Sequence, residues 1–282
     1  MRRHAIMIRM ACASLLLAAG LLLPVLSYSV AAASETETGN GVQEDVSGLI
    51  DELVIASGLD VSLNEAVDLL KEGAAKNKNT LSALGRSRFD ETMAEKFAMP
   101  RIMALLKDSL YGNKDKEKLQ AALDWFRSDV GRKIIDAEKY LSTPEGRKRR
   151  EHYLAYEPVY PTSADRLTLL YELDRLSGSS EFAQQMLNEI QAAFSSNMAF
   201  YRPGQARQDK IAATTADAKS RVKQRGILTM TLMYHEISDE ELAQGVAFMR
   251  TDAGQYWKDA GLRAMKIVQI DLNKKYLEMI ME

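Results

Sequence analysis

Cysteine is nearly absent from this sequence, which has one, at position 12, in 282 residues. A single thiol cannot form a disulfide framework or a thiolate zinc site within one chain. Charge of neither sign is in large excess, because the sequence has 37 Lys and Arg and 39 Asp and Glu, for a net charge of -2. Proteins that bind nucleic acids concentrate positive charge on one surface, so we expect no nucleic-acid partner.

Helix-breaking and aromatic residues are also infrequent, with 6 Pro, 16 Gly and an aromatic content of 7%. Good helix formers such as Ala, Leu, Met, Lys and Glu are abundant. No segment shows the alternation of apolar and β-branched residues with polar ones that is typical of strands. The composition therefore predicts an all-α fold, in one large or two modest domains.

The N-terminus has the three-part pattern of a secretory signal peptide. Arg2, Arg3 and Arg9 precede an apolar run over 11–26, which is followed by a short run of alanines. We expect cleavage near Ala33 and a periplasmic or secreted mature protein. If the segment is not cleaved, it is long enough to anchor the chain, since about 20 apolar residues span a bilayer. The sequence predicts no other contact with a membrane.

Helical periodicity begins at Val46, after a polar stretch that is typical of a flexible leader. Gly58 is expected to end the first helix. Ser62 and Glu65 have the spacing of a capping box, which predicts that a second helix starts directly after Ser62.

Two segments, 111–134 and 234–257, resemble one another at a constant offset of 123 residues. Each predicts a short amphipathic helix, a Ser or Thr that caps the next helix, and then an Asp and a Gly in its first turn. Because Gly destabilises a helix interior, Gly at this place indicates close approach of another helix backbone. The motif residues are Tyr111, Leu119, Phe126, Asp129 and Gly131 in the first segment, and Tyr234, Leu242, Met249, Asp252 and Gly254 in the second.

This pattern of Tyr, acidic cap, Leu, Phe, Ser or Thr, Asp and Gly resembles a bacterial family of secreted helical proteins classed as a domain of unknown function. Members commonly have a signal peptide, and their motif often runs Phe, x, Ser, Pro, x, Gly, then Lys or Gln. Here Asp129 and Asp252 stand where Pro is common. The resemblance covers about 24 residues per copy. It implies an all-helical protein of the export pathway, with no established catalytic residues.

Two related helical-bundle units, packed in tandem, are therefore expected. Pro158 and Pro161 favour a junction between them, because proline stops helices. The predicted organisation is a signal peptide over 1–33, a leader over 34–45, a first unit over 46–156, a junction over 157–162 and a second unit over 163–282.

Catalytic, cofactor-binding and metal-binding motifs are not recognisable in the sequence. His152 and His235 each lack a second His one helical turn away, so we expect no metal site and regard His235 as a partly exposed residue at a helix end. Asp129 and Asp252 are explained by their place in the first turn of a helix. A carboxylate pair for hydrolysis stays open, because sequence does not give the separation of two acids.

A basic cluster followed by tyrosines is the main candidate for partner binding. Cations can meet acidic partners or phospholipid headgroups, and aromatics beside cations can bind glycans or peptides. A solvated helix face explains the basic cluster better than binding does, and packing at the junction explains the tyrosines equally well. The candidates are Arg147, Arg149, Arg150, Tyr153, Tyr156 and Tyr160.

These observations predict an exported, non-catalytic binding or scaffold module with an envelope protein as partner. The first alternative is a carrier of a hydrophobic ligand or lipid in a pocket between helices, and the second is a carboxylate-dependent hydrolase. Each predicts a different structure: an exposed apolar groove, a closed apolar cavity, or a cleft with converging acids.

Overall fold

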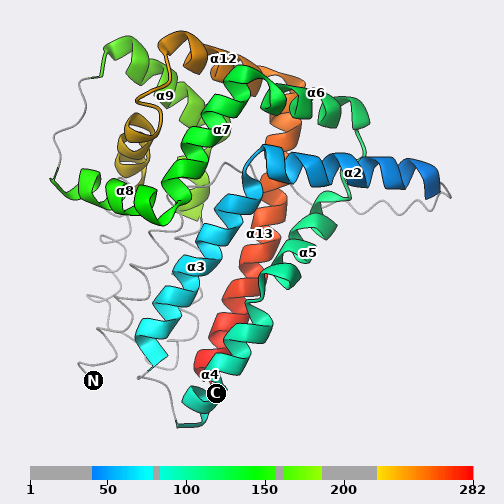
Figure 1. Cartoon of the computed structure of the whole chain (residues 1–282), viewed down its shortest axis with the longest axis vertical. Helices are drawn as coiled ribbons and strands as arrows, with labels where there is room; N and C mark the ends of the chain where they lie inside the picture. The colour runs from blue at the N-terminus through cyan, green and yellow to red at the C-terminus, as the bar shows by residue number, and fades with distance from the viewer. Residues whose placement is uncertain (1–39, 79–82, 157–161, 186–220, 282) are drawn as a thin grey trace, which may run out of the picture.

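Four segments are described by the computed structural model: 40–78, 83–156, 162–185 and 221–281. All their regular structure is helical, as the composition predicts (Figure 1). In chain order the helices are α2 (Asn40–Ala56), α3 (Leu59–Asn77), α4 (Ala83–Lys96), α5 (Met99–Leu110), α6 (Lys116–Arg127), α7 (Asp129–Ser142), α8 (Pro144–Tyr156), α9 (Ala164–Ser177), α12 (Asp239–Arg250) and α13 (Asp252–Met281). Further helical stretches cover 179–185 and 221–233.

The predicted signal peptide and most of the predicted junction lie outside the described residues. The predicted leader is in part helical, because α2 already begins at Asn40. In the described segments no helix combines the length and the apolar character needed to cross a membrane.

Glycine ends two helices, as expected at Gly58. Gly58 has φ 72° and Gly178 has φ 60°, both in the left-handed region that favours glycine. The predicted helix start after Ser62 is wrong, because α3 begins at Leu59 with Gly58 at its N-cap. The carboxylate of Glu65 instead accepts a hydrogen bond from an arginine of α8.

The corner between α6 and α7 has the predicted cap and close approach. Ser128 is the N-cap of α7, and its Oγ accepts a hydrogen bond from the Gly131 N–H at 3.0 Å. A Cβ added to Gly131 would lie 2.1 Å from the carbonyl oxygen of Trp125, closer than real Cβ contacts. The backbone that lies close to Gly131 is thus the last turn of the preceding helix, α6.

The same corner occurs between α12 and α13, and a third time between α7 and α8. Thr251 Oγ1 accepts from the Gly254 N–H and Thr143 Oγ1 from the Gly146 N–H, each at 3.1 Å. An added Cβ would lie 2.3 Å from a carbonyl oxygen of the preceding helix at Gly254, and 2.0 Å at Gly146. Sequence comparison at the 123-residue offset missed the third corner, although its Thr, two residues and Gly carry the same signal.

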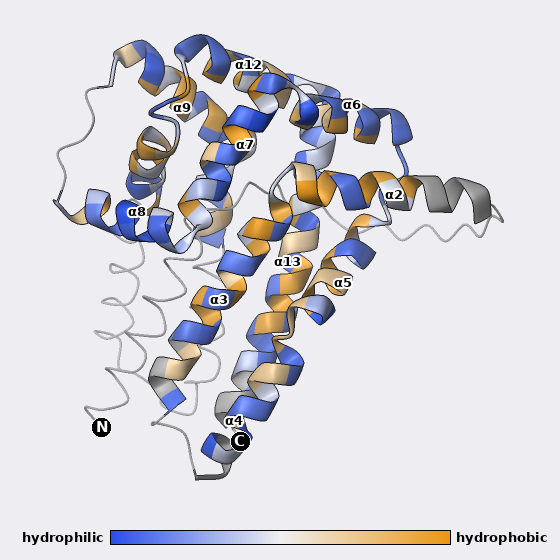
Figure 2. Cartoon of the chain, in the orientation of Figure 1, coloured by the Kyte–Doolittle hydropathy of each residue, from blue (hydrophilic) through white to orange (hydrophobic). Residues whose placement is uncertain are grey.

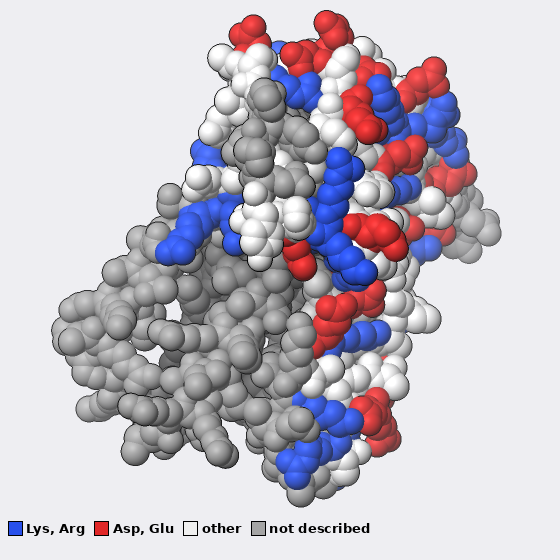
Figure 3. Space-filling view, turned by 60° about the vertical axis from the view of Figure 1, so that its left-hand side comes forward, with Lys and Arg blue, Asp and Glu red and all other residues white. Residues whose placement is uncertain are grey.

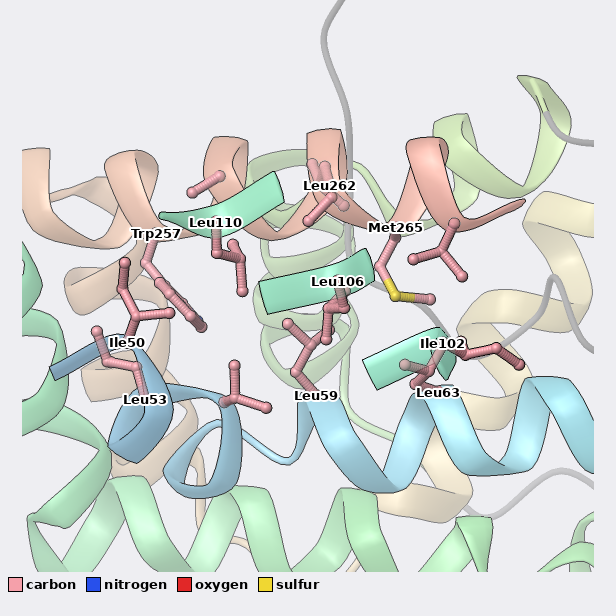
Figure 4. Close-up of a cluster of buried hydrophobic side chains, with 14 of the residues drawn as sticks. Ile50, Leu53, Leu59, Leu63, Ile102, Leu106, Leu110, Trp257, Leu262 and Met265 are labelled. Carbon is pink, nitrogen blue, oxygen red and sulfur yellow. The ribbon is translucent and has the colours of Figure 1, made fainter. Parts of the chain in front are cut away.

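The main hydrophobic core lies along α13, the longest described helix, which contacts α4, α5 and α6 (Figure 1). Figure 4 shows side chains of α2, α3, α5 and α13 meeting in this core. Hydrophobic and hydrophilic positions alternate along these helices in Figure 2, as in amphipathic helices. The labelled core residues are Ile50, Leu53, Leu59, Leu63, Ile102, Leu106, Leu110, Trp257, Leu262 and Met265.

A second cluster joins α7, α9, α12 and the stretch 221–233. It contains Ile134 of α7, Leu170 of α9 and Leu242 of α12. Because α13 packs on α5 while α7 packs beside 221–233, each cluster combines helices from before and after the predicted junction.

Candidate functional site

Helix α8 carries the basic and aromatic segment, but its central arginine is inside the protein. The side chains of Arg150 and Glu65 are only 5% and 3% exposed, and Arg150 Nη2 lies 2.9 Å from Glu65 Oε1. This buried ion pair joins α8 to α3. Tyr153 is also buried, in a small cluster with Leu141 and Leu232.

Arg150 and Tyr153 are therefore structural residues, and they do not belong to an exposed contact surface. Arg147 lies 3.8 Å from Glu72, with its side chain 17% exposed. Tyr156 is 80% exposed, whereas Tyr160 lies outside the described residues. Over the face drawn in Figure 3, Lys and Arg side chains lie among those of Asp and Glu. Partner binding by this segment stays a prediction.

A groove of about 620 Å³ with charged residues in its lining, between α7 and the turn after 221–233, brings together Asp129, Arg149 and His235. Arg149 Nη2 lies 3.3 Å from His235 Nε2, and His235 Nδ1 lies 2.8 Å from the Leu232 carbonyl oxygen. His235 is partly exposed just after a helix, as predicted. His152 is exposed and contacts Tyr156, with ring centroids 5.4 Å apart.

Metal-binding clusters are not found in the described part of the chain, where no group of three or more His, Cys, Asp or Glu could hold an ion. Asp129 and Asp252 each lie in the first turn of a helix, as expected.

The motif residues form packing contacts around the corners. Leu119 and Leu242 are fully buried. Phe126 packs edge-on against Phe248 with ring centroids 5.5 Å apart. Met249 packs against both hydrophobic clusters. These roles are structural.

An apolar cavity of about 130 Å³ lies where these corners meet. It is bounded by α6, α7, α9, α12, α13 and the stretches 179–185 and 221–233, with the end of α2 and the start of α3. Trp125 and Trp257 both line it, and they are the two tryptophans of the sequence. Trp125 stacks on Phe248 in its wall, with ring centroids 4.8 Å apart and an interplanar angle of 12°.

One polar group in the cavity wall is a carboxyl. Glu138 of α7 accepts a hydrogen bond from the Tyr234 hydroxyl at 2.6 Å. Burial raises the pKa of Glu138 to about 7, against the lowering effects of the Tyr234 hydrogen bond and the Lys139 charge. Burial, together with the carboxyl of Glu138, also raises the pKa of Tyr234 well above its usual value. Glu138 is half-buried as a whole residue, and burial is the largest influence on the pKa of its carboxyl.

A second polar part of the cavity wall is formed by the end of α9 and the start of the stretch 179–185. Asp174 is buried, and its Oδ1 accepts a hydrogen bond from the Ser180 N–H at 3.0 Å. Ser177 Oγ lies 3.0 Å from Ser179 Oγ. The carboxylate thus caps the stretch that follows the left-handed Gly178.

Two buried hydroxyls in the cavity wall have no hydrogen-bond partner in the described part of the chain. They are Ser57 Oγ, at the end of α2, and Ser180 Oγ. Buried polar groups are nearly always paired, since an unpaired one costs about 1–3 kcal/mol. A Cβ added to Gly226 would lie 3.1 Å from Ser180 Oγ, so a side chain at position 226 would press on that hydroxyl.

Sequence reasoning missed these groups, although a signal was present. Glu138 follows Ile134 by one helical turn, and Asp174 follows Leu170 in the same way, so both acids lie on apolar helix faces. An acid in that position indicates a buried polar site. Ser180 has no such signal, because its burial depends on Gly226 and the cavity.

Comparisons of the chain with protein-family models, with curated proteins and with solved structures gave no match. The resemblance to the secreted helical family therefore stays a prediction.

Proposed function

We propose that this protein binds a small, mainly apolar molecule in the cavity between its helix corners. The observation that carries the proposal is an apolar space of about 130 Å³ with two tryptophans and a stacked aromatic pair in its wall. Ligand sites in proteins are typically apolar and aromatic, with a few placed polar groups. Glu138, Asp174 and Ser180 supply such groups here.

The size of the cavity limits the ligand. An engineered apolar cavity of about 150 Å³ binds benzene, so 130 Å³ suits a ring or short chain of roughly six or seven non-hydrogen atoms. The ligand-carrier hypothesis is thereby narrowed to a small molecule or to one end of a larger one. A whole lipid would exceed this space.

We also propose that the chain contains two related units in tandem. The support for this comes from local features that the two units share. The α6–α7 and α12–α13 corners share the same cap and the same close glycine contact. The helices α2 and α9 both end at a left-handed glycine that follows a serine. Export is proposed from the N-terminal pattern, which would place the ligand in the envelope or outside the cell.

Hydrolysis by carboxylates has less support. Glu138 and Asp174 line one cavity, but each already accepts a hydrogen bond from the protein. A general acid or base needs reach to a substrate and to water. An apolar space of this size favours binding over hydrolysis.

The test uses a variant that fills the cavity without a clash. Gly261 lines the cavity, and a Cβ added there has no neighbour within 4 Å. We expect Gly261→Leu to fill the space and to abolish binding of cyclohexanol and methylcyclohexane. Both probes are transparent in the near ultraviolet, so the two tryptophans can report binding by fluorescence, with isothermal titration calorimetry as a second measurement.

Gly48→Leu is the matched control, because Gly48 is an exposed helical glycine with equally open space, outside the cavity. Gly48→Leu should bind both probes as the unchanged protein does. Absence of binding by the unchanged protein, or equal binding by Gly261→Leu, would contradict the proposal.

A further inference from the structure

Ser180 is the feature of the cavity that the apolar lining does not explain. Ser180 is 7% exposed, and its Oγ has no hydrogen-bond partner among the residues that the structure describes. Its neighbour Ser177 is also buried, at 2% exposed, but that hydroxyl lies 3.0 Å from Ser179 Oγ. Both serines lie in the same wall of the cavity, but only the hydroxyl of Ser177 has a hydrogen-bond partner.

A glycine of the neighbouring helical stretch 221–233 lies close to this hydroxyl. Gly226 lines the same cavity, and a Cβ there would come within 3.1 Å of Ser180 Oγ. Asp174, which could have accepted from the hydroxyl, instead accepts from the Ser180 backbone N–H. The hydroxyl therefore keeps an unused hydrogen-bonding capacity in a residue that lines the cavity, and Ser57 Oγ is a second unpaired group in the wall.

Charged ligands fit this wall poorly. Two acids line the cavity: Asp174 would repel an anion, and Glu138 adds to this repulsion above its pKa of about 7. Lys258 is the one basic residue among the described lining residues, and its Nζ already contacts Gln255 Oε1 at 2.5 Å and Asp259 Oδ1 at 3.1 Å. An ammonium group would lose its hydration in an apolar space, where both acids are already hydrogen-bonded.

We infer that the ligand is a neutral amphiphile, an alcohol, ketone or amide on a small apolar body, whose polar atom hydrogen-bonds to Ser180 Oγ. This inference rests on the proposed function, since it names the ligand class of the same cavity. Ser180 acts as the specificity residue, because a hydroxyl without a partner penalises a purely apolar occupant.

The experiment compares four probes of one ring size: cyclohexanol, methylcyclohexane, cyclohexanecarboxylate and cyclohexylammonium. Tryptophan fluorescence and calorimetry give the affinity of each for the unchanged protein and for Ser180→Ala. Loss of one neutral hydrogen bond should weaken cyclohexanol binding about three- to tenfold. Methylcyclohexane should bind Ser180→Ala at least as well as it binds the unchanged protein.

Two further variants separate this contact from general effects on the wall. Gly226→Ala should weaken cyclohexanol selectively, because its methyl group would press on Ser180 Oγ and displace it. Ser177→Ala should leave all affinities unchanged, since that hydroxyl is already paired. Without ligand, Ser180→Ala should unfold at the same temperature as the unchanged protein or above it, because an unpaired hydroxyl is lost.

The binding results distinguish a wrong ligand class from a wrong proposed function. If methylcyclohexane binds and Ser180→Ala does not change cyclohexanol affinity, the cavity binds ligands but Ser180 selects none. Tighter binding of the carboxylate or the ammonium probe would overturn the neutral ligand class. A lowered unfolding temperature of free Ser180→Ala would show that the hydroxyl serves a structural partner such as water. Absence of binding by all four probes would overturn both proposals.

Discussion

At the scale of a single residue, burial of Glu138 in the cavity wall couples folding to the uptake of a proton. Its carboxyl accepts one hydrogen bond, from Tyr234. Burial disfavours the charged form, which raises its pKa from 4.5 to about 7. The folded protein therefore binds a proton between pH 4.5 and pH 7 that the unfolded chain has released.

The stability contribution of this group should fall as the pH rises. Protonated Glu138 carries no penalty below pH 4.5, and the full penalty of the buried carboxylate is present above pH 7. A shift from 4.5 to about 7 corresponds to on the order of 3 kcal/mol. We expect Glu138→Gln to be more stable than the unchanged protein at pH 8 and similar at pH 4.5, as measured by urea unfolding at both values.

Glutamine is the suitable replacement because its amide oxygen can still accept from the Tyr234 hydroxyl. A difference between the two proteins that is the same at both pH values would mean that Glu138 titrates normally. Asp129→Asn, at an exposed acid, provides the control for a general effect of charge.

Residue-level roles were predictable where they depend on neighbours in the sequence. The caps at Ser128 and Thr251 follow from three-residue spacings, and both side chains accept the expected backbone hydrogen bonds. The burial of Arg150 was not predictable, because it depends on Glu65, which lies 85 residues away. A cluster of basic residues in a sequence does not tell which of them points inward.

At the scale of elements, the ion pair between Arg150 and Glu65 fixes α8 against α3. Both side chains are almost completely buried, so neither charge can be replaced by hydration if its partner is lost. The same pair explains why the predicted capping box was wrong. Glu65 was read as a local cap of its own helix, whereas it serves a contact between helices.

Removal of one partner should be more harmful than removal of both. We expect Arg150→Met to lower the free energy of unfolding by about 3–5 kcal/mol, because it leaves the Glu65 carboxylate buried without a cation. The double variant Arg150→Met with Glu65→Leu should recover a large part of this loss. Chemical denaturation of the three proteins measures the difference.

Arg132→Met is the matched control, since Arg132 pairs with Asp129 at the surface and both side chains are exposed. This change should have no measurable effect on unfolding, as is usual for exposed pairs. Equal losses for Arg132→Met and Arg150→Met would show that burial of the pair does not govern its contribution.

At the scale of the whole molecule, the all-α class was predictable, because composition and helical periodicity both indicate it. The arrangement of the helices was not. The hydrophobic pattern of α13 shows which side of it is buried, but the partners α4, α5 and α6 come from far earlier in the chain. Periodicity gives a helix its apolar face, and long-range packing decides what covers that face.

This packing predicts that neither half of the chain folds alone. Leu262, Met265 and Val268 of α13 are buried in the same core as Ile102 and Leu106 of α5. A fragment over 163–282 would expose this face of α13, and a fragment over 34–156 would expose the surfaces of α5 and α6 that α13 covers. Exposed apolar faces of this kind favour aggregation or a loosely packed state.

We therefore expect each fragment, produced separately, to lack a cooperative thermal transition by circular dichroism, and the two produced together to form a stable heterodimer. The intact protein should unfold in one transition, because both halves contribute to each hydrophobic cluster. Leu106→Asp in the first fragment should prevent reassembly, since it places a charge against α13, whereas Lys116→Asp at an exposed position should not. Two independent transitions in the intact chain, or a cooperatively folded single fragment, would instead indicate two self-sufficient units, with the cavity at an interface that can open.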